Sequence, residues 1–355
     1  MWTSALNSHS ECFVRHRGFV SVSAVFSVAQ LLCRVVRSRP GNAFLCWVVC
    51  AGLANAQNFP VKPVRLVAST MPGSQPDGIA RMLANEMSEQ WGKPVVVDNR
   101  PAANGVLAAA AVAKATPDGH TLLYVLPQFQ ISSATKLALP YDPRKDFAAV
   151  AQMGYSTNLL VAGAHAGVKS VRELIAAARA QPGKLVFGTG ATGTLAHLVG
   201  ARFNNAAGIK VIQVAFKGGP EAAVELLAGR SHYTLGTMGV LLPYVRDGRI
   251  VAIATANPKR SAVLPDVPSL AETFAEFKRT ETSHGFVVPA STPRAVLEVI
   301  SREVARDLAL PELKEKLIAI GFEPAHAGPD EYARILRGQL DGIVKLVVDA
   351  GLRPR

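Results

Sequence analysis

The chain alternates short runs of aliphatic and β-branched residues with longer amphipathic segments. Residues 64–68, 95–97 and 121–125 have the pattern of buried strands, and residues 78–91 and 105–115 have the periodicity of helices. Such alternation predicts an α/β architecture built on largely parallel sheets. The pattern continues with expected helices at 171–180, 195–204 and 220–228, strands at 185–187, 211–215, 233–235 and 250–254, and two tail helices at 293–309 and 329–350 separated by a short connection at 322–324.

Two extended apolar stretches, residues 148–162 and 283–289, interrupt this alternation because no crossover helix follows either of them. We interpret them as paired strands that carry the chain from one domain to another and back. This predicts a first domain of residues 57–159 and 284–355 and a second domain of residues 160–283.

The N-terminal part has the features of a secretory signal peptide. Three arginines between residues 34 and 39 precede an apolar run at 43–54, and Ala-Asn-Ala ends at Ala56. Residues 1–56 are therefore expected to be a leader that is cut after Ala56, and the alternative is a buried N-terminal helix. The apolar run is too short for a transmembrane helix. The first thirty residues do not fit one signal peptide, which suggests that translation begins near Val35 or Val36.

Removal of this leader changes the cysteine content and the charge of the chain. All four cysteines precede the expected cut, so a mature protein has no disulfides, thiolate zinc sites or cysteine nucleophiles, in keeping with export. The formal charge falls from +12 to +8 with the loss of five arginines and one glutamate. The remaining basic residues are scattered singly, which argues against nucleic-acid binding.

The first of three candidate ligand loops, residues 71–77, contains Ser74 and Asp77 at capping-box spacing. A well-capped helix explains this spacing without any ligand. In the functional interpretation, the amide of Gly73 and the start of the following helix bind an anion, because the helix dipole favours negative charge there.

The second loop, GTGATGTLAH at residues 188–197, contains the G-x-G-x-x-G spacing of a dinucleotide-binding turn. Such a turn needs an acidic residue about twenty positions later to bind the ribose, and residues 211–217 contain none. An NADP-linked enzyme that uses Lys217 is the alternative. The small hydroxyls and amides of Thr192, Gly193 and Thr194 lie at a helix start, whereas His197 is either a structural residue or a ligand contact.

The third loop, residues 215–220, opens another expected helix. Lys217 is the one cation in the three loops and suits the orientation of a carboxylate, although a solvated loop lysine is the plain alternative. The sequence has no H-E-x-x-H, G-x-S-x-G or Walker A motif. We therefore expect no enzymatic activity, no cofactor and no metal.

Several motifs in this order resemble the substrate-binding proteins of tripartite tricarboxylate transporters, the Bug family. The resemblance covers essentially all of the chain from Phe59 to the C-terminus. It rests on FPVKP at residues 59–63, PG at 72–73 with Asp77 and AR at 80–81, VDNRP at 97–101, ATPDGHTLL at 115–123, LPYDP at 139–143 with KDF at 145–147, PGK at 182–184, FKG at 216–218 and LPDVP at 264–268.

The resemblance implies a type II periplasmic-binding-protein fold, with two α/β lobes joined by two crossing strands and a ligand cleft between them. Family members hold a small organic carboxylate, largely through backbone amides and ordered waters from loops that match the three described above. The implied protein is a periplasmic monomer that passes its ligand to membrane subunits of a transporter. The alternative is an exported sensor or adaptor with the same fold.

The sequence departs from the family pattern at three places. Ser74 replaces the second glycine of the first loop, which is preceded by Thr70 and Met71 instead of the usual aromatic-Pro pair. Gly236 stands where relatives commonly have an aspartate that meets an amino group, which predicts a ligand without an α-ammonium group. Phe129 either stacks on the ligand or fills the lobe. The full set of expected ligand contacts is Pro72, Gly73, Ser74, Asp77, Gln128, Phe129, Thr189, Thr192, Gly193, Thr194, His197, Lys217, Gly218, Gly236 and Thr237.

Overall fold

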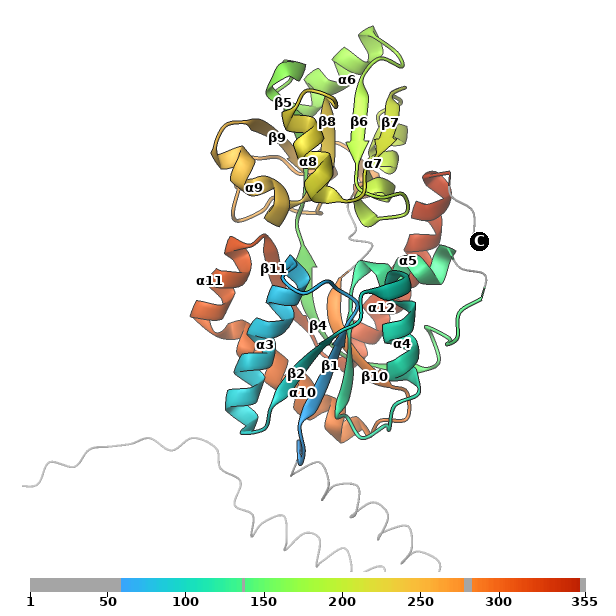
Figure 1. Cartoon of the computed structure of the whole chain (residues 1–355), viewed down its shortest axis with the longest axis vertical. Helices are drawn as coiled ribbons and strands as arrows, with labels where there is room; N and C mark the ends of the chain where they lie inside the picture. Colours follow the sequence, from blue (N-terminus) through green and yellow to red (C-terminus); the bar gives the residue numbers. More distant parts are fainter. Residues whose placement is uncertain (1–58, 136–137, 278–282, 352–355) are drawn as a thin grey trace, which may run out of the picture. The chain divides into compact units, whose positions relative to one another are not determined.

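A computed structural model describes residues 59–135, 138–277 and 283–351 of the chain (Figure 1). The predicted leader, its cleavage site and the proposed translation start lie outside these residues. The described residues contain two β-sheets with helices between the strands. The α/β fold class is therefore confirmed.

The first sheet has the strand order β11-β4-β10-β3-β1-β2. Parallel pairing joins β1 to β2 and to β3, whereas β10 pairs antiparallel with both β3 and β4, and β11 pairs antiparallel with β4. The strands are β1 (Val64–Ala68), β2 (Val95–Asn99), β3 (Thr121–Val125), β4 (Phe147–Ser156), β10 (His284–Pro289) and β11 (Phe322–Ala327).

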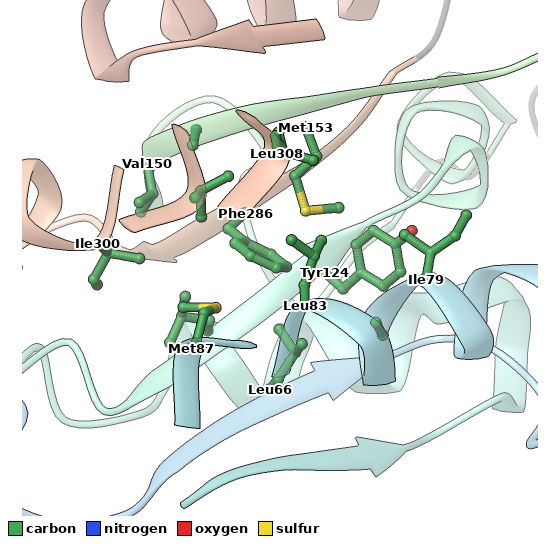
Figure 2. Packing of buried hydrophobic residues seen from close by; sticks show 14 of the residues in the cluster. Leu66, Ile79, Leu83, Met87, Tyr124, Val150, Met153, Phe286, Ile300 and Leu308 are labelled. Carbon is green, nitrogen blue, oxygen red and sulfur yellow. The ribbon is translucent and has the colours of Figure 1, made fainter. Parts of the chain in front are cut away.

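Helices cover both faces of the first sheet, and alternate side chains of its central strands belong to two different hydrophobic clusters. On one face, Leu66, Tyr124 and Phe286 pack against helices α3 (Gln75–Trp91), α10 (Arg294–Ala309) and α11 (Pro311–Ala319), as Figure 2 shows for part of this cluster. Each fully buried large apolar side chain contributes about 1.5–3 kcal/mol. On the other face, the strands pack against α4 (Val106–Ala113), α5 (Pro127–Thr135) and α12 (Pro329–Asp349).

The second sheet has the order β7-β6-β8-β5-β9 and combines both kinds of pairing. β6 pairs parallel with β7 and β8, and β5 pairs antiparallel with β8 and β9. Its strands are β5 (Asn158–Gly163), β6 (Val186–Thr189), β7 (Ile212–Ala215), β8 (Tyr233–Thr237) and β9 (Ile250–Thr255).

Strand β5 shows how the second sheet is covered on both sides. Leu160 belongs to the cluster that contains α6 (Val171–Ala180) and α7 (Leu195–Ala206). Its neighbour Leu159 belongs to the cluster that contains α8 (Gly219–Leu227) and α9 (Met238–Arg246). Short 3-10 turns complete the described elements at Ala102–Gly105, Ala164–Ala166, Leu270–Glu272 and Ala275–Phe277.

The chain passes from the first sheet to the second at Thr157. The expected extended stretch 148–162 consists of β4 and β5, which are separated by this one residue. After the second sheet, β10 pairs antiparallel with β4 and returns the chain to the first sheet. These are the two crossing strands of the expected fold.

Three expectations about secondary structure are wrong. The sheets are mixed and not largely parallel, because the strands at each crossing run antiparallel to their neighbours. The connection expected at residues 322–324 is the start of β11, and α11 precedes it. Pro324 is tolerated in β11 because this strand lies at the edge of the sheet, where an amide is not needed on one side. Helices α5 and α9 were not expected from the sequence.

The C-terminal helix belongs to the hydrophobic clusters of both sheets. Leu336 and Leu340 of α12 pack with the first sheet. Ile343, Leu346 and Val347, near the end of the same helix, pack in the cluster of the second sheet. The domain boundaries predicted from the sequence assign the whole tail to the first domain, and they stay a prediction.

Candidate functional site

The loop between β1 and α3 is organised by the carboxylate of Asp77. Its Oδ2 accepts hydrogen bonds from the amide of Gly73 at 2.8 Å and from Nε of Arg81 at 2.9 Å, and its Oδ1 accepts from Nδ2 of Asn99 at 2.8 Å. The side chain of Asp77 is 3% exposed. Burial alone would raise the pKa of Asp77, but the bonds from Arg81, Gly73 and Asn99 outweigh it and hold the pKa below its usual value. Asp77 is therefore an ionised residue that positions this loop.

Ser74 is the N-cap residue of α3, but its hydroxyl makes no capping bond to the helix. The hydroxyl donates to the carbonyl of Met71 at 2.7 Å and lies 2.6 Å from Oγ1 of Thr70. The capping-box prediction is therefore half right. The carboxylate of Asp77 accepts from the amide of a residue that precedes it, but this residue is Gly73 and not the N-cap residue Ser74. Of the first-turn amides, Gln75 and Asp77 make no hydrogen bond among the described residues.

The loop between β6 and α7 contains the expected helix start. Oγ1 of Thr194 accepts from the amide of His197 at 3.4 Å and caps α7. The amide of Gly193 donates to Nδ1 of His197, also at 3.4 Å. His197 is 4% exposed, and burial lowers its pKa, so the ring is neutral at pH 7. The structure thus gives His197 a structural partner within its own loop.

The loop between β7 and α8 lies beside the preceding loop. The amide of Phe216 donates to the carbonyl of Thr189 at 2.9 Å. A Cβ added at Gly190 would lie 3.5 Å from the amide nitrogen of Gly219 and 3.5 Å from Oγ1 of Thr194. The starts of α7 and α8 therefore face the same small space beside Gly190. The loop contains Gly218, which is the N-cap residue of α8.

The side chains of Lys217 in the third loop and Thr189 in the second loop differ in their exposure and in their hydrogen bonds. Lys217 is exposed and makes no ion pair with any described residue, while its amide donates to Oε2 of Glu221 at 2.6 Å. Thr189 is fully buried, and its hydroxyl has no hydrogen-bond partner within the described ranges. A buried hydroxyl without a protein partner is uncommon and is usually satisfied by water or a ligand.

Phe129 lies in the core of the first lobe. Its side chain is 4% exposed, stacks on Tyr141 and contacts the edge of Phe147. Of the two roles expected for Phe129, the structure shows the packing role. Its neighbour Gln128 is exposed, beside Gly105.

Gly236 and Thr237 end β8 and precede α9. Gly236 is buried, and a Cβ there would lie 3.2 Å from Cδ1 of Leu241. Thr237 is the N-cap residue of α9 and makes no capping bond with its side chain. The next amide, of Met238, donates to the carbonyl of Thr157 at 2.8 Å, which links this end of β8 to the crossing point of the chain.

A cavity of about 450 Å³ lies between two helix faces. The first belongs to the start of α3, and the second belongs to α9. The end of α11 completes the wall. Its lining residues are Gly73, Ser74, Gln75, Gly78, Met82, Gly239, Leu242, Pro243, Arg246, Ala319 and Ile320.

The structure brings some of the expected contacts together and leaves others apart. Gly73 and Ser74 line the cavity, whereas the second and third loops meet at Gly190. No hydrogen bond among the described residues joins the first loop to the other two. The sequence analysis did not identify the α9 side of the cavity, because Pro243 inside this segment argued against a helix. The available signal was the i, i+3, i+4, i+7 spacing of Gly239, Leu242, Pro243 and Arg246.

No group of three or more His, Cys, Asp or Glu side chains in the described part of the chain is arranged to hold a metal ion. No described helix has both the length and the apolar character needed to cross a bilayer.

Comparison with known proteins identifies the family. The model of the tripartite tricarboxylate transporter family receptor (TctC) matches residues 79–352. A UPF0065 protein of Bordetella bronchiseptica is 32% identical over 302 residues, which cover 85% of this chain and 89% of the relative.

Solved structures show the same fold. The R. palustris protein Rpa4515 with adipate has a TM-score of 0.72 and 30% sequence identity, and covers 84% of this chain and 100% of its own. The periplasmic binding protein BugD has a TM-score of 0.70 at 24% identity, with coverage of 84% and 100%. The fold is therefore the periplasmic-binding-protein fold with two lobes. The chain belongs to the receptor family of the tripartite tricarboxylate transporters, the Bug family of solute-binding proteins.

Proposed function

We propose that this protein binds a small organic carboxylate between its lobes in the periplasm and delivers it unchanged to the membrane subunits of a tripartite transporter. The observation that carries the proposal is the meeting of two helix starts beside Gly190. The relative Rpa4515, solved with adipate, supports a carboxylate as the ligand class.

Backbone amides at these helix starts provide the binding groups. At the start of α7 the amides of Leu195 and Ala196, and at the start of α8 the amides of the N-cap residue Gly218 and of Gly219, make no hydrogen bond among the described residues. Amides at a helix start donate to an anion, and the helix dipole favours the negative charge. They do so without the desolvation cost of burying several lysines. Thr189 adds a buried hydroxyl, and the exposed Lys217 adds a mobile cation.

The proposed ligand contacts are therefore concentrated in the second and third loops. Gly73 and Ser74, just before α3, and Gly236 and Thr237, just before α9, are the other proposed contacts. Asp77 and His197 act by holding the loops in position, because both carboxylate oxygens of Asp77 and Nδ1 of His197 accept hydrogen bonds from the protein. A ligand without an α-ammonium group is proposed, since Gly236 offers no carboxylate to pair with one.

Thermal unfolding of the purified full-length chain in the presence of a panel of carboxylates tests the proposal. A ligand at a hundred times its Kd adds about 2.7 kcal/mol to the free energy of unfolding. The expected result is a higher Tm with at least one plain carboxylate, and recovery of that ligand intact after overnight incubation. No shift with any carboxylate, chemical conversion of the ligand, or tighter binding of aspartate than of succinate would contradict the corresponding part of the proposal.

Export and delivery require separate measurements. N-terminal sequencing of the protein from the periplasmic fraction is expected to begin at Gln57. Capture by membrane subunits of a transporter is expected to require the bound ligand, whereas capture by a signalling receptor instead would favour the sensor alternative.

A further inference from the structure

A chain of hydrogen bonds runs from the core of the first lobe to the start of α3. The hydroxyl of Tyr124 on β3 lies 2.7 Å from Nδ1 of His284, and Nε2 of the same ring lies 3.2 Å from Oγ of Ser156. Oγ of Ser156 makes a long bond of 3.5 Å to Oε1 of Gln75, the first residue of α3. Nε2 of Gln75 donates to the carbonyl of Ile320 at 2.5 Å. His284 begins β10 and Ser156 ends β4, so the chain includes both crossing strands.

The donors and acceptors of this chain all point in one direction. At 2.5 Å from the carbonyl oxygen of Ile320, the side chain of Gln75 must present its NH₂ group, because a second oxygen there would be repelled. Oε1 of Gln75 therefore faces Ser156 and accepts its hydroxyl proton. Burial lowers the pKa of His284 to about 3, so its ring is neutral. This ring donates from Nε2 to Ser156 and accepts at Nδ1 from Tyr124.

The last bond of the chain lies against the second lobe. A Cβ at Gly239, in the first turn of α9, would lie 3.0 Å from the carbonyl oxygen of Ile320 and 3.1 Å from Nε2 of Gln75. The start of α9 therefore rests on the two atoms of this bond, and a glycine permits the close approach. The preceding residue, Met238, touches the first lobe at Gly321, where an added Cβ would lie 2.7 Å from Cβ of Met238.

The position of α9 affects the helix start that the proposed function uses. Met238, Leu241 and Leu242 of α9 share a hydrophobic cluster with Ala223 and Leu226 of α8. Packed interiors transmit a displacement because they contain few voids. A shift of α9 away from the first lobe therefore also moves the start of α8 relative to that lobe.

We propose that Gln75 is a positioning residue for ligand capture, because its amide group holds the start of α9 against the first lobe and thereby sets the position of α8. Tyr124, His284 and Ser156 orient this amide group from the core and from the two crossing strands. The inference goes beyond the proposed function, since the contact between the lobes needs no ligand. Only its effect on affinity rests on carboxylate binding.

Hydrogen–deuterium exchange of the full-length protein without ligand tests the contact. Gln75→Met keeps the length and the neutral charge of the side chain and removes both hydrogen-bonding groups. The amides of α9 are expected to exchange about fivefold faster, the factor for about 1 kcal/mol from one lost hydrogen bond. Exchange in α6, which covers the opposite face of the second sheet, is expected to stay unchanged. The matched control is Gln90→Met, since Gln90 is an exposed glutamine near the other end of α3.

A second variant tests whether the chain acts through Gln75. Ser156→Ala interrupts the chain one bond earlier, and it is expected to accelerate exchange in α9 in the same direction. The double variant should exchange no faster than Gln75→Met alone, because the chain is already broken at its last bond. An additive acceleration would show that Ser156 does not orient Gln75.

Calorimetric titration with succinate as the probe tests the effect on capture. The Kd of Gln75→Met is expected to be about fivefold higher than that of the wild type, and that of Gln90→Met unchanged. Unchanged exchange in α9 of Gln75→Met, equal acceleration in α9 and α6, or faster exchange with an unchanged Kd would overturn the inference. Failure of the wild type to bind succinate or any other carboxylate would contradict the proposed function, and the exchange data would still decide whether Gln75 positions α9.

Discussion

Oγ1 of Thr157 donates a hydrogen bond to Oε1 of Glu323 at 2.6 Å. Thr157 is the fully buried residue between β4 and β5, where the chain leaves the first sheet, and Glu323 belongs to the edge strand β11. Nδ2 of Asn257, which follows β9, lies 3.5 Å from the same Oγ1. The crossing point of the chain is therefore held by polar groups from both lobes.

Thr157→Val keeps the shape of the side chain and removes this bond. We expect a loss of about 1.5–3 kcal/mol in the free energy of unfolding, as for a hydrogen bond to a charged acceptor. Burial raises the pKa of Glu323, whereas the hydrogen bonds from Thr157 and Ser261 lower it and only partly offset the effect of burial. The variant raises that pKa further, so its deficit should be larger at pH 8 than at pH 5. Urea unfolding at both pH values measures this, and a deficit equal to that of the exposed control Thr116→Val would contradict it.

Gly321 tests the contact between the lobes. It has φ +78°, and an added Cβ would lie 2.7 Å from Cβ of Met238 on α9. We expect Gly321→Ala to lower the free energy of unfolding by about 1–2 kcal/mol for the left-handed backbone and by about 1–3 kcal/mol more for the clash. Gly183→Ala is the matched control, because Gly183 has φ +73° and open space around its Cβ position. Equal losses in the two variants would show that Met238 moves away freely.

Asp307 on α10 is expected to destabilise the protein at alkaline pH. It is 1% exposed, and neither carboxylate oxygen has a hydrogen-bond partner within the described ranges. Burial, followed by the charges of Glu303 and Glu86, raises its pKa to about 7. Because the folded protein holds this proton more tightly than the unfolded chain, the contribution of Asp307 to stability is greatest below pH 4 and is lost as the pH rises towards 7.

Asp307→Asn should therefore be more stable than the wild type at pH 8, by on the order of 1–2 kcal/mol after allowance for solvent screening, and the advantage should disappear at pH 4. The exposed Asp266→Asn is the control. Thermal unfolding of the three proteins from pH 4 to pH 8 is the measurement, and parallel curves for Asp307→Asn and the wild type would refute the expectation.

His284 on the crossing strand β10 predicts the opposite trend. Its Nδ1 lies 2.7 Å from the hydroxyl of Tyr124, and its Nε2 lies 3.2 Å from Oγ of Ser156. Burial lowers its pKa to about 3. The unfolded chain binds this proton more readily, so stability is lost as the pH falls from about 6.5 towards 3.

In His284→Gln, which retains hydrogen-bonding groups without titrating, the loss of stability between pH 7 and pH 4 should shrink by roughly 2 kcal/mol. His165→Gln changes an exposed histidine and serves as the control. An acid transition in His284→Gln that coincides with that of the wild type would show that His284 does not govern it.

Much of the fold was predictable because the local pattern and the tertiary structure agree. The strands at 64–68 and 121–125 and the helix at 171–180 have the predicted bounds. Alternate side chains of these strands are buried on both faces, which is the condition under which apolar runs mark strands. Helix α5 was missed because it begins at Pro127 directly after a strand, which looks like a turn in the sequence. Helix α9 was missed because it contains Pro243 and Gly239.

The roles of individual site residues depended on partners far away in the sequence. Asp77 has the spacing of a capping residue. In the structure, however, Asn99 and Arg81 donate hydrogen bonds to its carboxylate, and Asp77 thereby positions the loop. Phe129 looks exposed in a loop, but Tyr141 and Phe147 cover it. A local sequence pattern does not predict such partners, because they lie in other helices, strands and loops.

The sequence by itself determined the alternation of strands and helices, the two crossings and the family, because these depend on local periodicity and on short motifs. Only the tertiary structure decided that the starts of α7 and α8 meet beside Gly190, that α12 packs with both sheets, and that Arg246 lines a cavity with the start of α3. The physical reason is that a cavity and its charge arise from residues that share neither an element nor a periodicity, and that are brought together by the packing of the two sheets.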